Sequence, residues 1–213
     1  WNEKFYNELM QRGNLAVPCE IRLEDARHTS IADECVSAII TSPPYVTSYE
    51  YADIHQLTAY WMEYVSDFHE FRKKFIGSSY SGNISLVVPN CELAQNIVND
   101  LAAKSKNIAH NVAQYFNDMQ DVAKEIARIL VPNGYACIVI GNTKIKEVQI
   151  KSAEVFFEFL QNIGLKKVKV IKRSIPHKLM PTLRDKNTGR FTKQDNPNCK
   201  KVYPNEYILI MKK

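Results

Sequence analysis

The stretch VSAIITSPPY, residues 36–45, combines a strand signal with an abrupt end. Residues 36–41 are rich in apolar and β-branched side chains, which favour a β-strand. The strand must stop at Pro43 and Pro44, because proline fixes φ near about −65° and has no N–H to donate to a neighbouring strand. We therefore expect a rigid, extended corner whose carbonyl groups need partners other than the amides of the corner itself.

The side chains at this corner suit a planar ligand that carries an amino group. Ser42 has a hydroxyl that can accept or donate a hydrogen bond, and the ring of Tyr45 offers a flat face for stacking. In open α/β sheets, ligands bind beyond the carboxyl ends of the strands. For the tetrapeptide alone, a proline-stiffened strand exit with a surface tyrosine is the preferred explanation. The strand before it and the aromatic segment after it raise the functional interpretation above that explanation.

Helical and strand patterns alternate along the rest of the chain. This alternation predicts an α/β fold with a mainly parallel sheet, whose last two strands pair antiparallel at one edge. Ile54, Leu57, Trp61, Met62 and Val65 fall mostly on one helical face, and we expect Leu57 and Trp61 to pack in the core. The predicted strands cover residues 18–26, 35–41, 135–142, 166–174 and 206–213, and the predicted helices cover 2–12, 51–65, 92–130 (as one helix or two) and 152–164.

Composition indicates a single domain of 213 residues with 45% hydrophobic residues. We expect a soluble, cytoplasmic protein, because no window approaches the roughly 18 apolar residues of a membrane span and the first residues do not resemble a signal peptide. The five cysteines are widely spaced and form no C-x-x-C pair, so they indicate neither a zinc site nor a redox pair.

Charge is distributed unevenly along the chain. Residues 165–213 hold 14 Lys and Arg against 3 Asp and Glu, whereas residues 1–164 hold 14 against 20. Such a basic tail is typical of a segment that faces a polyanion, although a solvated lysine-rich surface explains the charge equally well. Within the polar loop at about 174–205, the candidate contacts to DNA phosphates or base edges are Lys178, Arg184, Lys186, Arg190 and Lys193.

The motif Thr41-Ser42-Pro43-Pro44-Tyr45 resembles the catalytic signature of the amino-group DNA methyltransferases, in the form typical of cytosine-N4 enzymes. EIRLEDA, LVPNGYACIVIGN and NEYILIMKK resemble further family strands in the family's order. The resemblance implies a Rossmann-like class I methyltransferase sheet with helices on both faces. Residues 1–213 would be its catalytic part, with a mostly helical insertion at about 46–130 and the basic loop as the DNA-recognition element.

The resemblance also implies a mechanism and a cofactor, S-adenosylmethionine. Ser42 and the Pro43 carbonyl would accept hydrogen bonds from the amino group of a flipped base, and Tyr45 would stack on that base. Pro44 completes the catalytic motif. Asp25 and Thr41 would face the cofactor, although a solvated acid at a strand end explains Asp25 nearly as well. No metal and no catalytic cysteine is implied.

One family element is missing from the sequence. The glycine-rich cofactor loop, F-x-G-x-G, does not occur, and all seven glycines are isolated. In the family, two further strands lie between the strands expected at 18–26 and 35–41. We therefore predict that an upstream segment or a second chain supplies them. Adenine-N6 methylation, methylation of RNA or of protein glutamine, and a non-catalytic DNA-binding or assembly role remain as alternatives to cytosine-N4 methylation.

Overall fold

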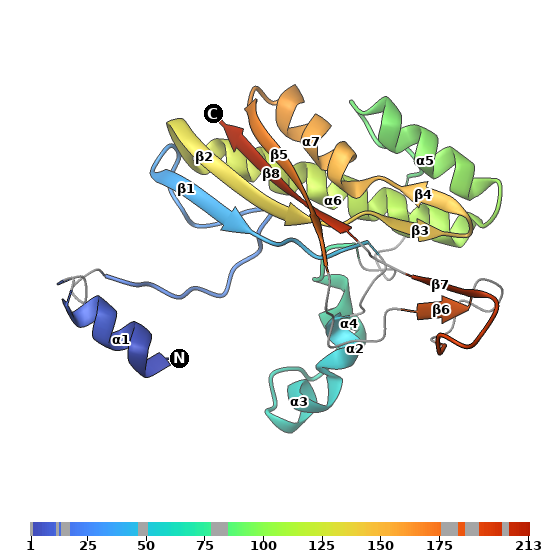
Figure 1. Cartoon of the computed structure of the whole chain (residues 1–213), viewed down its shortest axis with the longest axis horizontal. Helices are drawn as coiled ribbons and strands as arrows, with labels where there is room; N and C mark the ends of the chain where they lie inside the picture. Colours follow the sequence, from blue (N-terminus) through green and yellow to red (C-terminus); the bar gives the residue numbers. More distant parts are fainter. Residues whose placement is uncertain are drawn as a thin grey trace.

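The computed structural model describes residues 2–11, 13, 18–46, 51–77, 85–175, 183–185, 192–201 and 205–213. Its centre is a four-stranded sheet in the order β1-β2-β8-β5, with helices packed behind it (Figure 1). The predicted strands at 35–41, 135–142, 166–174 and 206–213 are confirmed. They correspond to β1 (Val36–Thr41), β2 (Leu130–Ile140), β5 (Lys166–Ser174) and β8 (Asn205–Lys212).

The mainly parallel sheet that the sequence predicts is confirmed, because β1, β2 and β5 point the same way and β8 is the reversed strand of this four-stranded sheet. Among the described strands, β1 and β2 pair in parallel, with Ile40 opposite Cys137, whereas β8 pairs antiparallel with both β2 and β5. The expected antiparallel pairing of the last two strands is confirmed. Strand β8 lies between β5 and β2, and the described residues that connect β5 to β8 include no helix, as suits an antiparallel pair.

Three helices build the core with this sheet: α5 (Glu92–Ala102), α6 (Lys106–Ile129) and α7 (Ser152–Asn162). The region 92–130 therefore forms two helices. The predicted inward stripe of α6 is confirmed, because Val122, Ile126 and Ile129 are at most 7% exposed. Figure 1 shows α6 running behind the strands and α7 to the right of β5. Among the described helices, none has both the length and the apolar character needed to cross a membrane.

The two faces of the sheet are covered unequally. Ile138 on β2 and Leu209 on β8 are register partners and are almost fully buried, because their face meets the helices. On the opposite face, Tyr135 is 45% exposed and Ile40 is 82% exposed. The described helices thus leave an apolar face of the sheet partly uncovered.

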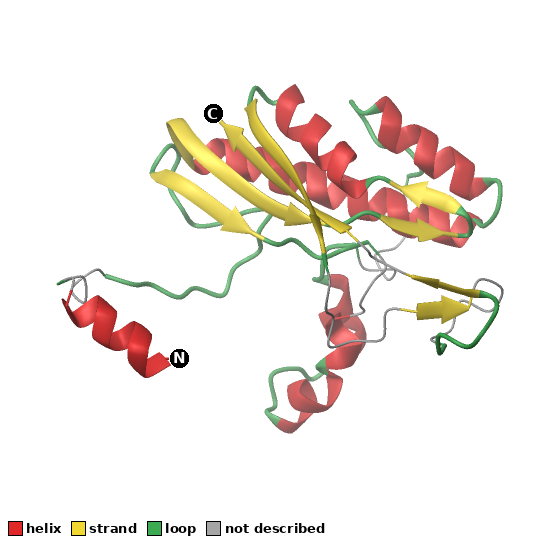
Figure 2. Cartoon of the chain, viewed as in Figure 1, coloured by secondary structure: helices red, strands yellow, loops and turns green. Residues whose placement is uncertain are grey.

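Two short hairpins accompany the main sheet and were not expected from the sequence (Figure 2). One consists of β3 (Thr143–Ile145) and β4 (Val148–Ile150). The other, β6 (Leu183–Asp185) with β7 (Cys199–Lys201), lies within the range expected to be a loop. Strands of three residues are too short for an alternation of polar and apolar side chains to identify them.

The first predicted strand is not formed. Residues 18–24 are assigned neither to a helix nor to a strand, and the nearest ladder contact is an isolated bridge between Asp25 and His28. Ile21 is 95% exposed and Leu23 is 103% exposed. The segment has an alternating pattern but no neighbouring strand to pair with in the described part of the chain. The predicted first helix is confirmed as α1 (Asn2–Gln11), which lies away from the sheet in Figure 1.

The core packing predicted for Leu57 and Trp61 is wrong. This region forms two short helices, α2 (Tyr51–Ile54) and α3 (Gln56–Trp61), followed by α4 (Phe68–Lys73). The break between α2 and α3 ends the helical period, so one stripe cannot run through both. Ala52, Ala59 and Phe68 are buried instead. The exposed side chains include Ile54, Leu57, Trp61 and Met62, and Val65 is half-buried.

Candidate active site

The Ser42–Tyr45 corner lies where the sequence predicts it, directly after β1 at the carboxyl end of the strand. Ser42 is exposed, Pro43 is buried, and Pro44 and Tyr45 are half-buried. Val46, only 1% exposed, anchors the chain in the core immediately after the corner. The serine hydroxyl is therefore accessible while the residues that follow it are held by packing.

Helix α6 reaches the corner through Tyr115. The hydroxyl of Tyr115 donates a hydrogen bond to the Pro44 carbonyl at 2.9 Å, and the Tyr115 side chain is 3% exposed. Its ring also packs closely against Gly77, where a Cβ would come within 3.0 Å of Cδ2 of the tyrosine. One carbonyl of the proline pair is thus satisfied by a buried side chain, as the lack of donors in the corner requires.

The ring of Tyr45 is held from two sides. A Cβ at Gly141, directly after β2, would lie 2.9 Å from Cε2 of the tyrosine, so only glycine lets the ring lie this close. The Tyr45 hydroxyl donates to Oε2 of Glu206 at 3.5 Å, and Glu206 forms an ion pair with Arg173. Because Glu206 is 6% exposed, its carboxylate faces the tyrosine from inside the fold.

These contacts determine which groups of the corner remain available to a ligand. The Pro44 carbonyl is engaged by Tyr115, whereas the hydroxyl of Ser42 is exposed. A hydroxyl beside a half-buried aromatic ring can bind an amino group and the plane that carries it. The corner therefore offers an exposed hydroxyl for hydrogen bonding and an aromatic face for stacking.

Asp25 lies on the N-terminal segment and is engaged by Arg27. Arg27 Nη2 donates to Asp25 at 2.7 Å, and Arg27 Nη1 donates to Asp118 of α6 at 2.9 Å. The hydrogen bonds from Arg27 hold the pKa of Asp25 below its ordinary value, and the same bonds raise the pKa of Arg27. Asp25 thus stays ionised and is attached through Arg27 to the helix that supports the corner.

A second contact attaches the N-terminal segment to α6. Glu125 accepts hydrogen bonds from the backbone and the hydroxyl of Thr29, at 2.8 and 2.6 Å, and from Arg128 Nε at 2.8 Å. These donors, with Arg128 first, lower the pKa of Glu125 to about 2. Residues 25–29 are therefore fastened along α6 even though the segment joins no strand.

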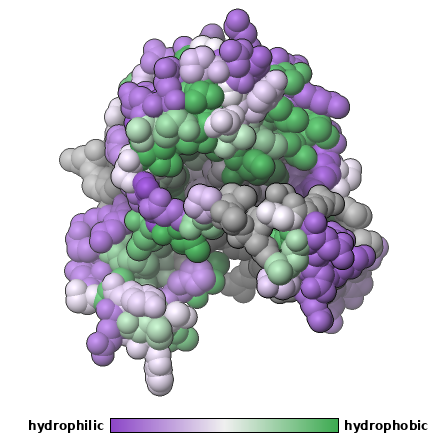
Figure 3. Space-filling model, turned by 90° about the vertical axis from the view of Figure 1, so that its left-hand side faces the viewer, coloured by the Kyte–Doolittle hydropathy of each residue, from purple (hydrophilic) through white to green (hydrophobic). Residues whose placement is uncertain are grey.

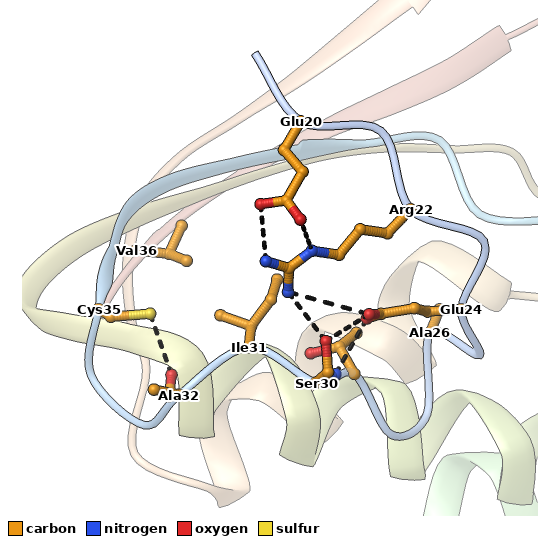
Figure 4. Close-up of a pocket in the computed structure, with 10 residues that line it drawn as sticks. Glu20, Arg22, Glu24, Ala26, Ser30, Ile31, Ala32, Cys35 and Val36 are labelled. Carbon is orange, nitrogen blue, oxygen red and sulfur yellow. Dashed lines mark hydrogen bonds and ion pairs between the residues drawn. The ribbon is translucent and has the colours of Figure 1, made fainter. Parts of the chain in front are cut away.

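A hollow lies between the N-terminal segment and the start of β1 (Figure 4). Arg22 crosses it and bonds to Glu20 at 2.6 Å and to Ser30 at 2.8 Å. Cys35 and Val36 line it from the β1 side. Because Val36 begins β1 and the candidate corner follows its last residue, this hollow is at the opposite end of the strand from Ser42.

The candidate DNA contacts are only partly described. Lys178, Lys186 and Arg190 lie outside the described residues. Arg184 lies on β6, although its side chain is not among those described, and Lys193 is exposed. In Figure 1, β6 and β7 lie on the side toward which β1 and β2 point. The Ser42–Tyr45 corner, which follows β1, is on that side too.

Three residues of the site were missed by sequence reasoning: Tyr115, Gly141 and Glu206. Tyr115 belongs to an apolar helical stripe, a pattern typical of core residues. The available signal was its hydroxyl, because a buried tyrosine normally needs a hydrogen-bond partner. Glu206 is the polar first residue of the last predicted strand, and nothing local indicates that it faces Tyr45.

The sheet and its corner define a class: a Rossmann-like α/β protein with a serine–proline–proline–tyrosine platform at the carboxyl end of a strand. The chain belongs to the DNA methylase family of N6 and N4 methyltransferases, which matches residues 36–213.

Individual relatives are distant and longer. The type II methyltransferase M.MvaI of Kocuria varians is 24% identical over an alignment of 194 residues, and the match covers 85% of this chain and 43% of that protein. A DNA modification methylase of Thermus thermophilus, solved with S-adenosyl-L-methionine, has a TM-score of 0.43 and 18% identity over 90% of this chain and 54% of that chain. A second structure of the same methylase gives a TM-score of 0.43 at 17% identity, over 90% and 52%. This chain thus spans about half the length of the relatives it matches.

Proposed function

We propose that the complete protein is a site-specific DNA methyltransferase that transfers a methyl group to N4 of cytosine in double-stranded DNA, within a restriction-modification system. The carrying observation is the Ser42–Tyr45 corner at the end of β1, held by Tyr115, in a chain that belongs to the DNA methylase family. S-adenosylmethionine, when bound, supplies the methyl group in electrophilic form. Among the residues of this chain, Thr41 and Asp25 are the candidates to face it.

The proposed task of the corner is to prepare the amino group. The amino nitrogen of cytosine is a poor nucleophile because its lone pair is delocalised into the ring. Ser42 Oγ and the Pro43 carbonyl accept hydrogen bonds from its two N–H groups, which favours a pyramidal nitrogen. Tyr45 stacks on the base once it has left the duplex. Lys178, Arg184, Lys186, Arg190 and Lys193 contact the DNA.

Serine as the first residue of the motif favours cytosine-N4 over adenine-N6 methylation. The deciding experiment is mass spectrometry of nucleosides from DNA treated with the complete enzyme. N4-methylcytosine is the expected product, and N6-methyladenine would contradict the cytosine assignment. Ser42→Ala should abolish methylation in the same assay while DNA binding persists. Unchanged methylation by this variant would favour the alternative, a DNA-binding or assembly subunit.

The proposal includes a cofactor-binding half outside this chain, in an upstream segment or a second chain that carries the F-x-G-x-G loop. Three observations support it. The outer edge of β1 has no partner strand among the described residues. On the same strand, the side chain of Ile40 is 82% exposed. The segment before β1 also exposes apolar side chains, because Phe5 is 60% exposed and Leu23 is 103% exposed. Figure 3 shows hydrophobic residues gathered in the upper part of this side of the molecule.

An unpaired edge and an uncovered apolar sheet face are features that stable domains avoid. Strands that pair with β1 would satisfy the edge, and a further layer packed on the sheet would bury the apolar face. The test is a titration of this chain alone, and then of the complete enzyme, with S-adenosylmethionine by calorimetry. We expect binding by the complete enzyme only; tight, stoichiometric binding by the isolated chain would contradict a second half.

A further inference from the structure

We infer that Tyr115 is a positioning residue for methyl transfer, which fixes the direction in which the proline corner presents its hydrogen-bond acceptors. This inference rests on the proposed function. Tyr115 lies 71 residues from Pro44 in the sequence, and the family match by itself assigns it no role. The positioning role is indicated by the geometry: the hydroxyl of the buried Tyr115 donates a hydrogen bond to the Pro44 carbonyl of the corner.

The two prolines themselves have no backbone donor with which to hold the orientation of the corner. The proline rings restrict φ at both positions, and Pro44 also restricts ψ of Pro43, but no proline ring restricts ψ of Pro44 and neither residue has an N–H to anchor it. Rotation about ψ of Pro44 turns the peptide plane that links it to Tyr45. The hydrogen bond from Tyr115, at 2.9 Å, engages the oxygen of that plane and restrains this rotation.

Tyr115 is itself held firmly enough to act as such a restraint. It is 3% exposed, near the middle of α6, and its ring contacts Gly77. The backbone N–H of Gly77 donates to Oδ2 of Asp118 at 2.8 Å, and Asp118 lies one turn further along the same helix. The glycine that touches the tyrosine ring is thus fastened to the helix that carries the tyrosine.

The bond also separates the roles of the two proline carbonyls. The carbonyl of Pro44 accepts from Tyr115, whereas the hydroxyl of the exposed Ser42 and the Pro43 carbonyl are the acceptors that the proposed function assigns to the amino group. Because transfer requires the acceptors to hold the amino group in line with the methyl donor, a small rotation of the corner reduces the rate. A misplacement of about 1 Å costs on the order of 10²-fold in such reactions.

The test is Tyr115→Phe in the complete enzyme, measured by single-turnover and steady-state methylation of duplex DNA. We expect the rate of methyl transfer to fall by about ten- to a hundredfold while KM for DNA stays within about twofold. Base flipping, followed by fluorescence of a cytosine analogue at the target position, should persist, because Tyr45 and the DNA contacts remain.

Gln120 supplies a matched control. It lies on the same helix and its side chain donates to another proline carbonyl, that of Pro89, at 2.9 Å, away from the corner. Gln120→Met should lower the melting temperature about as much as Tyr115→Phe without changing the transfer rate. Equal rates in wild type and Tyr115→Phe, or an equal loss in Gln120→Met, would overturn the inference. Absence of any methylation by the wild-type enzyme would instead contradict the proposed function.

Discussion

The ring of Tyr45 lies directly against Gly141, so that a methyl group at position 141 would sit 2.9 Å from Cε2 of the tyrosine. The two residues follow the neighbouring parallel strands β1 and β2 and therefore meet at the same edge of the sheet. The absence of a side chain at position 141 therefore allows the Tyr45 ring to lie this close to the sheet. The site thus depends on a residue that carries no chemistry of its own.

Gly141→Ala should displace the Tyr45 ring. We expect the affinity of the complete enzyme for DNA that contains an unpaired target base to fall about tenfold, because stacking on an aromatic side chain contributes about 1–3 kcal/mol per base. Fluorescence anisotropy with such a duplex measures it. Gly134→Ala is the control, because its methyl group would meet the Val131 carbonyl oxygen at 2.9 Å, away from Tyr45. If both variants weaken base binding equally, the loss reflects general destabilisation.

Glu206 should be energetically coupled to Tyr45 through the hydroxyl contact at 3.5 Å. We expect a double-mutant cycle of Tyr45→Phe and Glu206→Gln to give a coupling energy of about 0.5–1.5 kcal/mol in the free energy of unfolding. Chemical denaturation of the four proteins measures it. A second double-mutant cycle, of Tyr207→Phe and Glu206→Gln, is the control. It tests whether the loss of a hydroxyl from another tyrosine near Glu206 gives the same coupling energy. Strict additivity of Tyr45→Phe and Glu206→Gln would show that the contact contributes nothing.

Acid should weaken the attachment of the N-terminal segment through Glu125. Its pKa is about 2 in the folded protein and near the ordinary value of 4.5 when unfolded, so the unfolded state binds the proton first as pH falls. The stabilisation is therefore complete above about pH 5 and is lost progressively as pH falls toward about 2. Unfolding free energies of wild type and Glu125→Gln should converge over this range.

Asp33→Asn is the matched comparison for that experiment. Asp33 pairs with the same guanidinium, that of Arg128, but its side chain is 75% exposed. Exposed ion pairs contribute little, so this variant should follow the wild-type pH dependence. If the unfolding free energies of wild type and Glu125→Gln fall equally steeply as pH is lowered, the acid sensitivity does not arise from Glu125.

Arg27→Met should release residues 25–29 from α6. The guanidinium joins Asp25 to the buried Asp118, and its loss leaves Asp118 with one donor fewer. We expect a destabilisation of about 1–3 kcal/mol and faster amide hydrogen exchange around Thr29. Arg22→Met, which removes the more exposed pairing with Glu20, should change neither quantity appreciably. Unaltered exchange in Arg27→Met would show that the segment is held by other contacts.

The sequence alone was sufficient for the elements whose signals are local. The β-branched run at 36–41 predicted β1, and two prolines predicted where it ends, because φ restriction and a missing donor act on the residue itself. The same holds for the apolar stripe of α6 around Val122 and Ile126. The residues of the corner were therefore accessible without a structure, and so was the absence of a glycine-rich loop.

Only the tertiary structure decided what those elements meet. Residues 18–24 carry a strand pattern yet form no strand, because a strand exists only with a hydrogen-bonding partner and none is present in the described part of the chain. Leu57 and Trp61 follow a helical period yet are exposed, because the helix breaks. Tyr115 holds Pro44 across 71 residues, and Glu206 meets Tyr45 across 161. Such contacts depend on how the sheet and α6 pack, which no local pattern encodes.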